Sequence, residues 1–229
     1  PDGQVLDLKL NYQGEWFTYA FSPALASAGT DLQHLGSPAA ARVLSRFQDW
    51  HQRGLIDPDL DDAAFLKGRV ALSWAGHWEY PRYAQRWGSD LCLIPLPNFG
   101  LGSRSGQGSW NWAITSHCRQ PERAAEFLEF LLEDPQVLEM TAGNGAVPGT
   151  LSAIVRSPLY REDGPLRLFA VQLTQGWCEP RPATPAYPFL TSVFQQAMQD
   201  VLHGAPVPEV LNTAAQDIRQ DDLDNQGYR

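Results

Sequence analysis

Two glutamates in this sequence lie beside aromatic side chains, in arrangements that could carry acid–base chemistry. Glu15 stands in GEWFTY and Glu79 in AGHWEY, so each is next to a tryptophan. A glycosidase uses two carboxyl groups, and its surroundings keep one of them protonated. The pair therefore suggests a glycoside-processing enzyme as one hypothesis. A surface charge, or an acceptor for a hydroxyl group, is the more ordinary explanation for each residue.

The tryptophans of the chain indicate a different chemistry, the binding of a flat or ring-shaped ligand. Trp16, Trp78 and Trp110 each lie close to a Gly or Ser and where a predicted element begins or ends. A tryptophan face offers an apolar plate to the C–H side of a sugar ring, and nearby Glu, Asn or Arg groups can bond its hydroxyls. Three further tryptophans at periodic, core-facing positions are expected to be core residues instead: Trp50, Trp74 and Trp112.

Other kinds of chemistry find no support in the residue spacing. Cys92, Cys118 and Cys178 are far apart and none belongs to a CxxC pair, so we expect neither a disulfide framework nor a metal site. Cys92 is predicted to be a buried strand residue. No HExxH, phosphate-loop, GxSxG or GxGxxG motif occurs, and no nucleophile–His–Asp set has a local signature. We therefore expect no cofactor.

Composition sets the broad class of the protein. The chain has 229 residues, of which 43% are hydrophobic and 19% charged, as in globular proteins. Its formal net charge of −9 argues against nucleic acid and anionic membrane surfaces as partners, because both need a basic face. No apolar run approaches the roughly 20 residues of a membrane span. The chain begins with Pro1 rather than Met, so we expect it to be processed or cut.

The elements that must position these residues alternate between strands and helices. Strands are predicted at 6–12, 69–74, 91–97 and 110–114, and helices at 37–54, 61–68, 120–134, 135–143, 164–176, 189–204 and 208–223. The clearest helix has Ser37 as N-cap and Pro38 at its first position. Residues 100–109 and 146–155 are predicted to be loops. The alternation predicts an α/β fold with a mixed or parallel sheet.

Several segments resemble one known family. FLKGRVALSWAGHW (65–78) resembles the F-x-x-G-x-x-A-M-x-x-x-G-x-W segment of the extracellular solute-binding proteins of ABC importers, in their carbohydrate-binding, maltose-binding-protein-like branch. The segments 12–21, 27–32, 91–100, 108–150 and 187–218 resemble that family's segments in the same order. The resemblance implies a periplasmic-binding-protein-like lobe, in which helices flank a central mixed or parallel sheet and the C-terminal helices pack on it.

The resemblance also implies which residues contact a sugar. Trp78 is similar to the family's stacking aromatic, Trp16 matches a sugar-stacking position, and Glu15 is offset by one from a carboxylate position. The remaining residues expected to bind the ligand are Glu79, Trp110, Asn111, Arg181 and Tyr187. Glu79 would be a hydroxyl partner. Arg181 could pair with an acidic ligand, although a lone arginine in a proline-rich turn is more often a surface residue.

The resemblance implies a domain organisation and partners as well. Residues 1–112 and 156–229 would form the C-terminal lobe, and residues 113–155 would cross to a first lobe that is mostly missing from this chain. Phe127 and Leu131 on the crossing segment should then be exposed or covered by another chain. The family binds sugars in a cleft between its lobes, delivers them to an ABC permease and catalyses no reaction. We therefore expect a non-enzyme in the periplasm or outside the cell, with a lipid anchor at a removed N-terminal segment.

Three hypotheses remain open at the level of sequence. The first is the sugar-binding component of an importer, with a monosaccharide, an oligosaccharide, a polyol or glycerol phosphate as ligand. The second is the glycoside-processing enzyme that uses Glu15 and Glu79. The third is a non-catalytic interaction module, whose exposed helix faces dock a protein partner or a second copy across the surface left by the missing lobe.

Overall fold

The computed structural model describes residues 3–57, 61, 63–108 and 110–228, and it divides the chain into two compact units. Unit 1 comprises Pro1–Ala75, Pro95–Gln107 and Trp177–Arg229. Unit 2 comprises Gly76–Ile94 and Gly108–Gly176. The chain crosses between the units four times, so each unit is built from segments that are distant in sequence.

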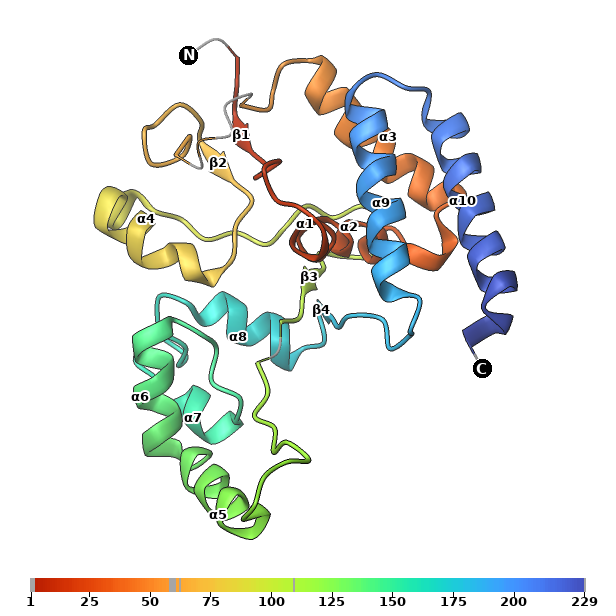
Figure 1. Ribbon diagram of the computed structural model, residues 1–229. Helices are drawn as coiled ribbons and strands as arrows, with labels where there is room; N and C mark the ends of the chain where they lie inside the picture. The colour runs from red at the N-terminus through yellow and green to blue at the C-terminus, as the bar shows by residue number, and fades with distance from the viewer. Residues whose placement is uncertain (1–2, 58–60, 62, 109, 229) are drawn as a thin grey trace. The chain divides into compact units, whose positions relative to one another are not determined.

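Unit 1 contains short strands and the longest helices of the chain (Figure 1). Its elements in chain order are β1 (Leu6–Asp7), α1 (Glu15–Phe21), α2 (Pro23–Ser27), the 3-10 helix η1 (Leu32–His34), α3 (Pro38–Gln52), β2 (Leu72–Ser73), β3 (Ser105–Gly106), β4 (Cys178–Glu179), α9 (Tyr187–Leu202), α10 (Val207–Asp224) and η4 (Gln226–Tyr228).

The strands of unit 1 form two small parallel sheets. In the first, β1 pairs with β2 through Leu6 and Leu72; in the second, β3 pairs with β4 through Ser105 and Cys178. Helices α1 and α2 contact the second sheet. The predicted fold class, an α/β lobe in which helices flank a mixed or parallel sheet, is confirmed, and the pairing is parallel. In the described residues the strands form two-stranded pieces rather than one extended central sheet.

Helix α3 begins where the sequence predicts and anchors the helical layer of unit 1. The hydroxyl of Ser37 accepts a hydrogen bond from the backbone N–H of Ala40 at 3.2 Å, and Pro38 occupies the first turn, where an N–H has no helical partner. One face of α3 is fully buried against α9 and α10, which lie beside it (Figure 1). The two C-terminal helices therefore pack against the helix that the sequence predicts most clearly.

Aromatic side chains fill the core of unit 1. The ring of Trp74 lies 5.8 Å from that of Phe21 and 5.9 Å from that of Phe47, and its indole N–H donates to the carbonyl of Ala20 at 3.1 Å. Only 7% of Trp74 is exposed, which confirms the prediction that it is a core residue. Trp50 is partly buried against the same cluster.

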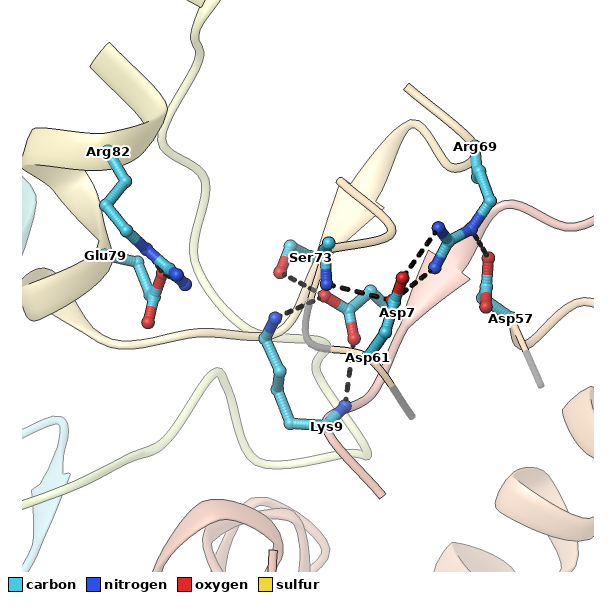
Figure 2. Close-up of polar contacts among 9 residues, drawn as sticks. Asp7, Lys9, Asp57, Asp61, Arg69, Ser73, Glu79 and Arg82 are labelled. Atoms are coloured by element: carbon cyan, nitrogen blue, oxygen red, sulfur yellow. Dashed lines mark hydrogen bonds and ion pairs between the residues drawn. The ribbon is translucent and has the colours of Figure 1, made fainter. Parts of the chain in front are cut away.

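Two groups of charged side chains tie the ends of β1 and β2 to neighbouring turns (Figure 2). The carboxylate of Asp7 pairs with the buried ammonium of Lys9 at 2.6 Å and accepts from the Ser73 hydroxyl at 3.1 Å. Arg69 bridges Asp57 at 2.8 Å and Asp61 at 2.7 Å, and this arginine holds the pKa of Asp61 well below its usual range. These contacts stabilise the chain around the small sheet.

Unit 2 consists of short helices around a smaller core. Its elements are η2 (His77–Glu79), α4 (Tyr80–Trp87), η3 (Gly88–Asp90), α5 (Pro121–Leu131), α6 (Asp134–Asn144), α7 (Leu151–Arg156) and α8 (Arg167–Thr174). Tyr160 is buried at its centre with Ile154 and Leu166, and its hydroxyl donates to the carbonyl of Gly145. Phe127, on the apolar face of α5, is exposed, as the sequence predicts.

Several predicted elements are wrong. Residues 91–97 and 110–114 form no strand, and Cys92 is exposed rather than buried. Trp112 is 56% exposed and is not a core residue. In the predicted helix at 61–68, residues 64–68 form a turn, and position 62 lies outside the described residues. The predicted loop at 146–155 contains most of α7. The two strand predictions fail for the same reason: an apolar run predicts burial, but it does not specify a partner strand.

Candidate functional site

The candidate site in unit 1 is built around the start of α1. Gly14 has a φ of +57°, a left-handed conformation that glycine adopts without strain, and it directly precedes the helix. Glu15 and Trp16 are the first two residues of α1, and Tyr19 follows Glu15 by one turn. The first turn of a helix favours a carboxylate because its backbone N–H groups carry partial positive charge.

Three of the residues predicted to bind ligand meet at this helix start. The Nε of Arg181 donates to Oε1 of Glu15, and the hydroxyl of Tyr187 donates to the same oxygen at 3.3 Å. Arg181 lies in the proline-rich segment after β4, and Tyr187 is the first residue of α9. The fold therefore brings together residues that are 166 and 172 positions apart in the sequence.

The backbone and an aromatic ring hold the arginine of this group in place. Nη1 of Arg181 donates to the carbonyl of Gln107 at 3.5 Å, and the guanidinium lies over the ring of Tyr19, 4.9 Å from its centroid. A cation over an aromatic face is attracted by the ring's quadrupole, which makes the face partially negative. Arg181 is thus fixed from three sides in unit 1. We call Glu15, Tyr19, Arg181 and Tyr187 the Glu15 cluster.

Arg181 and Tyr187 have fixed charge states near neutral pH. The hydrogen bond that Arg181 donates to Glu15 raises the pKa of Arg181, and burial followed by the Glu15 charge raises the pKa of Tyr187. Arg181 is therefore a cation and Tyr187 a neutral phenol that donates. The arginine and glutamate side chains remain 36% and 38% exposed, so their pairing contributes little to folding stability. Its main effect is on the charge and position of groups that a solute could reach.

Trp16 lies beside the Glu15 cluster and keeps much of its surface accessible. It is 50% exposed, and its ring packs edge-on to Tyr19 at 6.0 Å and tilted to Tyr12 at 6.3 Å. The hydroxyl of Tyr19 donates to the carbonyl of Gly106 at 3.1 Å, and a Cβ on Gly106 would lie only 2.7 Å from the Tyr19 ring. Tyr19 is thus a positioning residue that sequence reasoning misses. Its spacing of four from Glu15 on one helix face could have revealed it.

Trp78 and Glu79 belong to unit 2, in the short helix η2. A Cβ on Gly76 would lie 2.2 Å from the Trp78 indole, so the ring rests directly against the glycine backbone. His77 packs edge-on to Trp78 at 5.4 Å and to Phe169 at 5.9 Å, and burial lowers the pKa of His77. Gly76 is therefore needed for the observed position of the Trp78 ring.

Glu79 is buried rather than open to solvent. It is 7% exposed, and Nε of Arg82, three residues along, donates to its Oε2 at 2.9 Å (Figure 2). Arg82 Nη2 donates to the same oxygen. Glu15 and Glu79 thus each accept hydrogen bonds from an arginine.

The last two predicted ligand residues, Trp110 and Asn111, lie in an irregular part of unit 2. Trp110 is 94% exposed and Asn111 is also exposed. They belong to the stretch expected to be a strand, and they join no cluster comparable to that around Glu15. In the described residues no group of three or more His, Cys, Asp or Glu side chains could hold a metal ion. No helix there is long and apolar enough to span a membrane.

Comparison with known proteins identifies both a family and a fold. The family described as bacterial extracellular solute-binding protein matches residues 10–165, which is more than half of the chain. No curated protein matches. Solute-binding proteins are not enzymes, in agreement with the expectation that this chain catalyses no reaction.

Solved structures of similar fold include sugar-binding proteins. The cyclic α-maltosyl-1,6-maltose binding protein of Arthrobacter globiformis is 22% identical with a TM-score of 0.71, and the match covers 95% of this chain and 59% of that one. The maltose/maltodextrin-binding domain MalE of Bdellovibrio bacteriovorus, bound to maltotriose, is 18% identical with a TM-score of 0.75 over 97% and 61%.

A third structure of similar fold holds another kind of solute. UgpB of Mycobacterium tuberculosis, in complex with glycerophosphocholine, is 16% identical with a TM-score of 0.70, covering 98% of this chain and 59% of that one. At these identities the likeness concerns the fold alone. The chain spans about 60% of the length of the structures that it matches.

Proposed function

Because the chain belongs to the family of bacterial extracellular solute-binding proteins, we propose that it is part of the sugar-binding component of an ABC-type importer. The solute is a mono- or oligosaccharide, held by aromatic stacking and by hydrogen bonds to its hydroxyl groups. The extracellular family gives the protein a periplasmic or extracellular location. A permease partner and an N-terminal lipid anchor are further parts of this proposal.

The observation that carries the proposal is the half-exposed indole of Trp16 beside the Glu15 cluster. The indole supplies an apolar plate, while Glu15, Arg181 and Tyr187 supply fixed acceptors and donors next to it. A few oriented polar groups around an aromatic plate are the usual composition of a small-molecule site. Because Arg181 and Glu15 are held by several contacts, little side-chain entropy is lost when a hydroxyl binds them.

Trp78 in unit 2, whose ring rests on Gly76, is proposed as a further sugar-stacking residue. Trp110 and Asn111 are proposed as further ligand contacts because they are exposed. Glu79 has a weaker claim as a hydroxyl partner, since its buried carboxylate already accepts from Arg82. Trp16 and the Glu15 cluster should therefore be tested first.

We further propose that residues 113–155 meet a part of the whole protein that lies outside this chain. The chain covers about 60% of its structural relatives, and Phe127, Phe130 and Leu132 expose apolar side chains on or next to α5. Such surface is normally covered in a soluble protein. Without its cover, the same face offers a route to self-association of the isolated chain.

The experiment compares the isolated 229-residue chain with the whole protein that contains it, using calorimetry with glucose, maltose, maltotriose and trehalose. We expect the whole protein to bind at least one of these sugars and the isolated chain to bind it much more weakly. Micromolar or tighter binding to the isolated chain would refute the half-site proposal. Hydrolysis of nitrophenyl glycosides by the whole protein, lost in Glu15→Gln, would instead favour an enzyme.

A further inference from the structure

We propose that Glu15 determines the charge specificity of the site: by neutralising Arg181, it adapts the site to uncharged sugars and against phosphorylated or acidic ones. This inference rests on the proposed function, because it concerns the same solute site. It assigns a specific role to the Glu15–Arg181 pair rather than to either residue alone.

An arginine without a carboxylate partner would give this site the opposite preference. The guanidinium is planar and always charged, and its N–H groups match the geometry of phosphate and carboxylate oxygens. Arg181 lies at the surface beside the aromatic plate of Trp16, where such an anion could otherwise approach. The sequence alone therefore leaves an acidic ligand open as a partner for Arg181.

The contacts that Arg181 makes within the protein disfavour the binding of an anion to its guanidinium. Its Nε donates to Glu15, its Nη1 donates to the Gln107 carbonyl at 3.5 Å, and one face of the guanidinium lies over Tyr19. The carboxylate that compensates the positive charge stays 38% exposed, so an incoming anion would meet it directly. An uncharged hydroxyl is not repelled in this way, because it can donate to the carboxylate or accept from the guanidinium.

A second arginine near the same sheet is compensated in the same manner. Arg104 precedes β3, and its Nε lies 3.2 Å from a carboxylate oxygen of Glu179 in β4. Glu179 is two residues before Arg181 in the chain. Both arginines beside the β3–β4 sheet therefore have acidic partners within unit 1. This part of the surface holds no net positive charge from them that would attract an anionic solute.

The test uses sugars in pairs that differ in charge: glucose and glucuronate, maltose and maltose 1-phosphate, and trehalose and trehalose 6-phosphate. Dissociation constants are measured by calorimetry on the whole protein, as wild type and as Glu15→Gln. The control is Glu209→Gln, which makes the same change in net charge at an exposed position of α10. Thermal unfolding of each variant checks that the fold is retained.

We expect the wild type to bind the uncharged member of a pair at least about tenfold more tightly than the anionic member. Glu15→Gln should shift the ratio of the two dissociation constants about tenfold in favour of the anion. A tenfold shift corresponds to about 1.4 kcal/mol, the effect expected of one uncompensated charge. Glu209→Gln should leave the ratio unchanged. Arg181→Gln, a second variant in case Glu15→Gln unfolds, should shift the ratio the other way, because the carboxylate is then left alone.

The outcomes separate this inference from the proposed function. If the whole wild-type protein binds an uncharged sugar but neither Glu15→Gln nor Arg181→Gln changes the ratio by more than about twofold, the charge-specificity proposal is wrong while the proposed function stands. Preference of the wild type for an anionic member also overturns it. Binding to none of the six compounds, and not to maltotriose either, overturns both proposals.

Discussion

Trp74→Ala should be among the most destabilising single substitutions in unit 1. The side chain is 7% exposed and packs against Phe21 and Phe47, so truncation removes nearly all of a large buried surface and leaves a cavity. Buried Trp→Ala changes cost about 3–5 kcal/mol. The carbonyl of Ala20 also loses the indole N–H that donates to it at 3.1 Å, which adds about 1 kcal/mol. We expect a total loss of about 4–6 kcal/mol in the free energy of unfolding.

Two further variants give this measurement its controls. Trp74→Phe keeps an aromatic ring among Phe21 and Phe47 but removes the N–H, so it should cost about 1–2 kcal/mol. Trp110→Ala truncates the same kind of side chain where it is 94% exposed, and should change stability by less than about 0.5 kcal/mol.

The assay is urea denaturation followed by far-ultraviolet circular dichroism, because these substitutions alter the tryptophan fluorescence itself. The signal reports mainly on unit 1, which contains the longest helices, α3, α9 and α10. A loss below about 1 kcal/mol for Trp74→Ala, or one equal to that of Trp110→Ala, would refute the argument that Trp74 is a core residue of the fold.

Three other perturbations have defined outcomes. Ser37→Ala removes the cap on the Ala40 N–H and should cost about 1 kcal/mol in the same denaturation assay, with Ser37→Thr as the milder control. Gly76→Ala should displace the Trp78 ring, so near-ultraviolet dichroism changes while the helical content does not; an unchanged spectrum would contradict the contact. Burial lowers the pKa of His77, so the folded state favours the neutral ring and stability falls as pH drops below about 6.5, down to the lowered pKa. His77→Phe should remove this part of the acid-side loss, seen as a smaller difference between the denaturation midpoints at about pH 7.5 and 5.5.

The helices could be predicted because the signals that begin and end them are local. The hydroxyl of Ser37 caps α3 by accepting a hydrogen bond from a backbone N–H only three residues along the chain. Pro38 and Pro121 lie in the first turns of α3 and α5, where a backbone N–H has no helical partner to lose. Both C-terminal helices were equally recognisable from their apolar spacing. In unit 2, α4 and α7 were missed, because their eight and six residues carry patterns too short to recognise.

The strands could not be predicted in the same way, since a strand exists only through a partner that can lie anywhere in the chain. Residues 91–97 are apolar, yet Pro95 and Pro97 have no N–H to donate to a neighbouring strand. Ile94 and Cys92 are exposed there, so hydrophobicity alone was misleading. β3, in contrast, forms inside a stretch of Gly and Ser that looks like a loop, because β4 lies beside it.

The residues of the candidate site could be predicted from the sequence, but their arrangement in space could not. Resemblance to a family selects Glu15, Arg181 and Tyr187 separately, whereas their shared hydrogen bonds depend on how distant segments fold together. Tyr19 was missed for the same reason. Its four-residue spacing from Glu15 was visible, but nothing in the sequence says that Arg181 lies over its ring.

Calorimetric titration of the whole protein with the tightest-binding sugar of the panel, carried out on tryptophan variants, is the most direct test of whether Trp16 contacts the solute. The comparison is between the wild type, Trp16→Ala and Trp112→Ala, the last being a tryptophan of similar exposure outside the proposed site. We expect Trp16→Ala to weaken binding by about 100-fold or more, as for a central aromatic contact, while Trp112→Ala leaves the affinity within about twofold of wild type. Equal affinities for the wild type and Trp16→Ala would contradict this expectation.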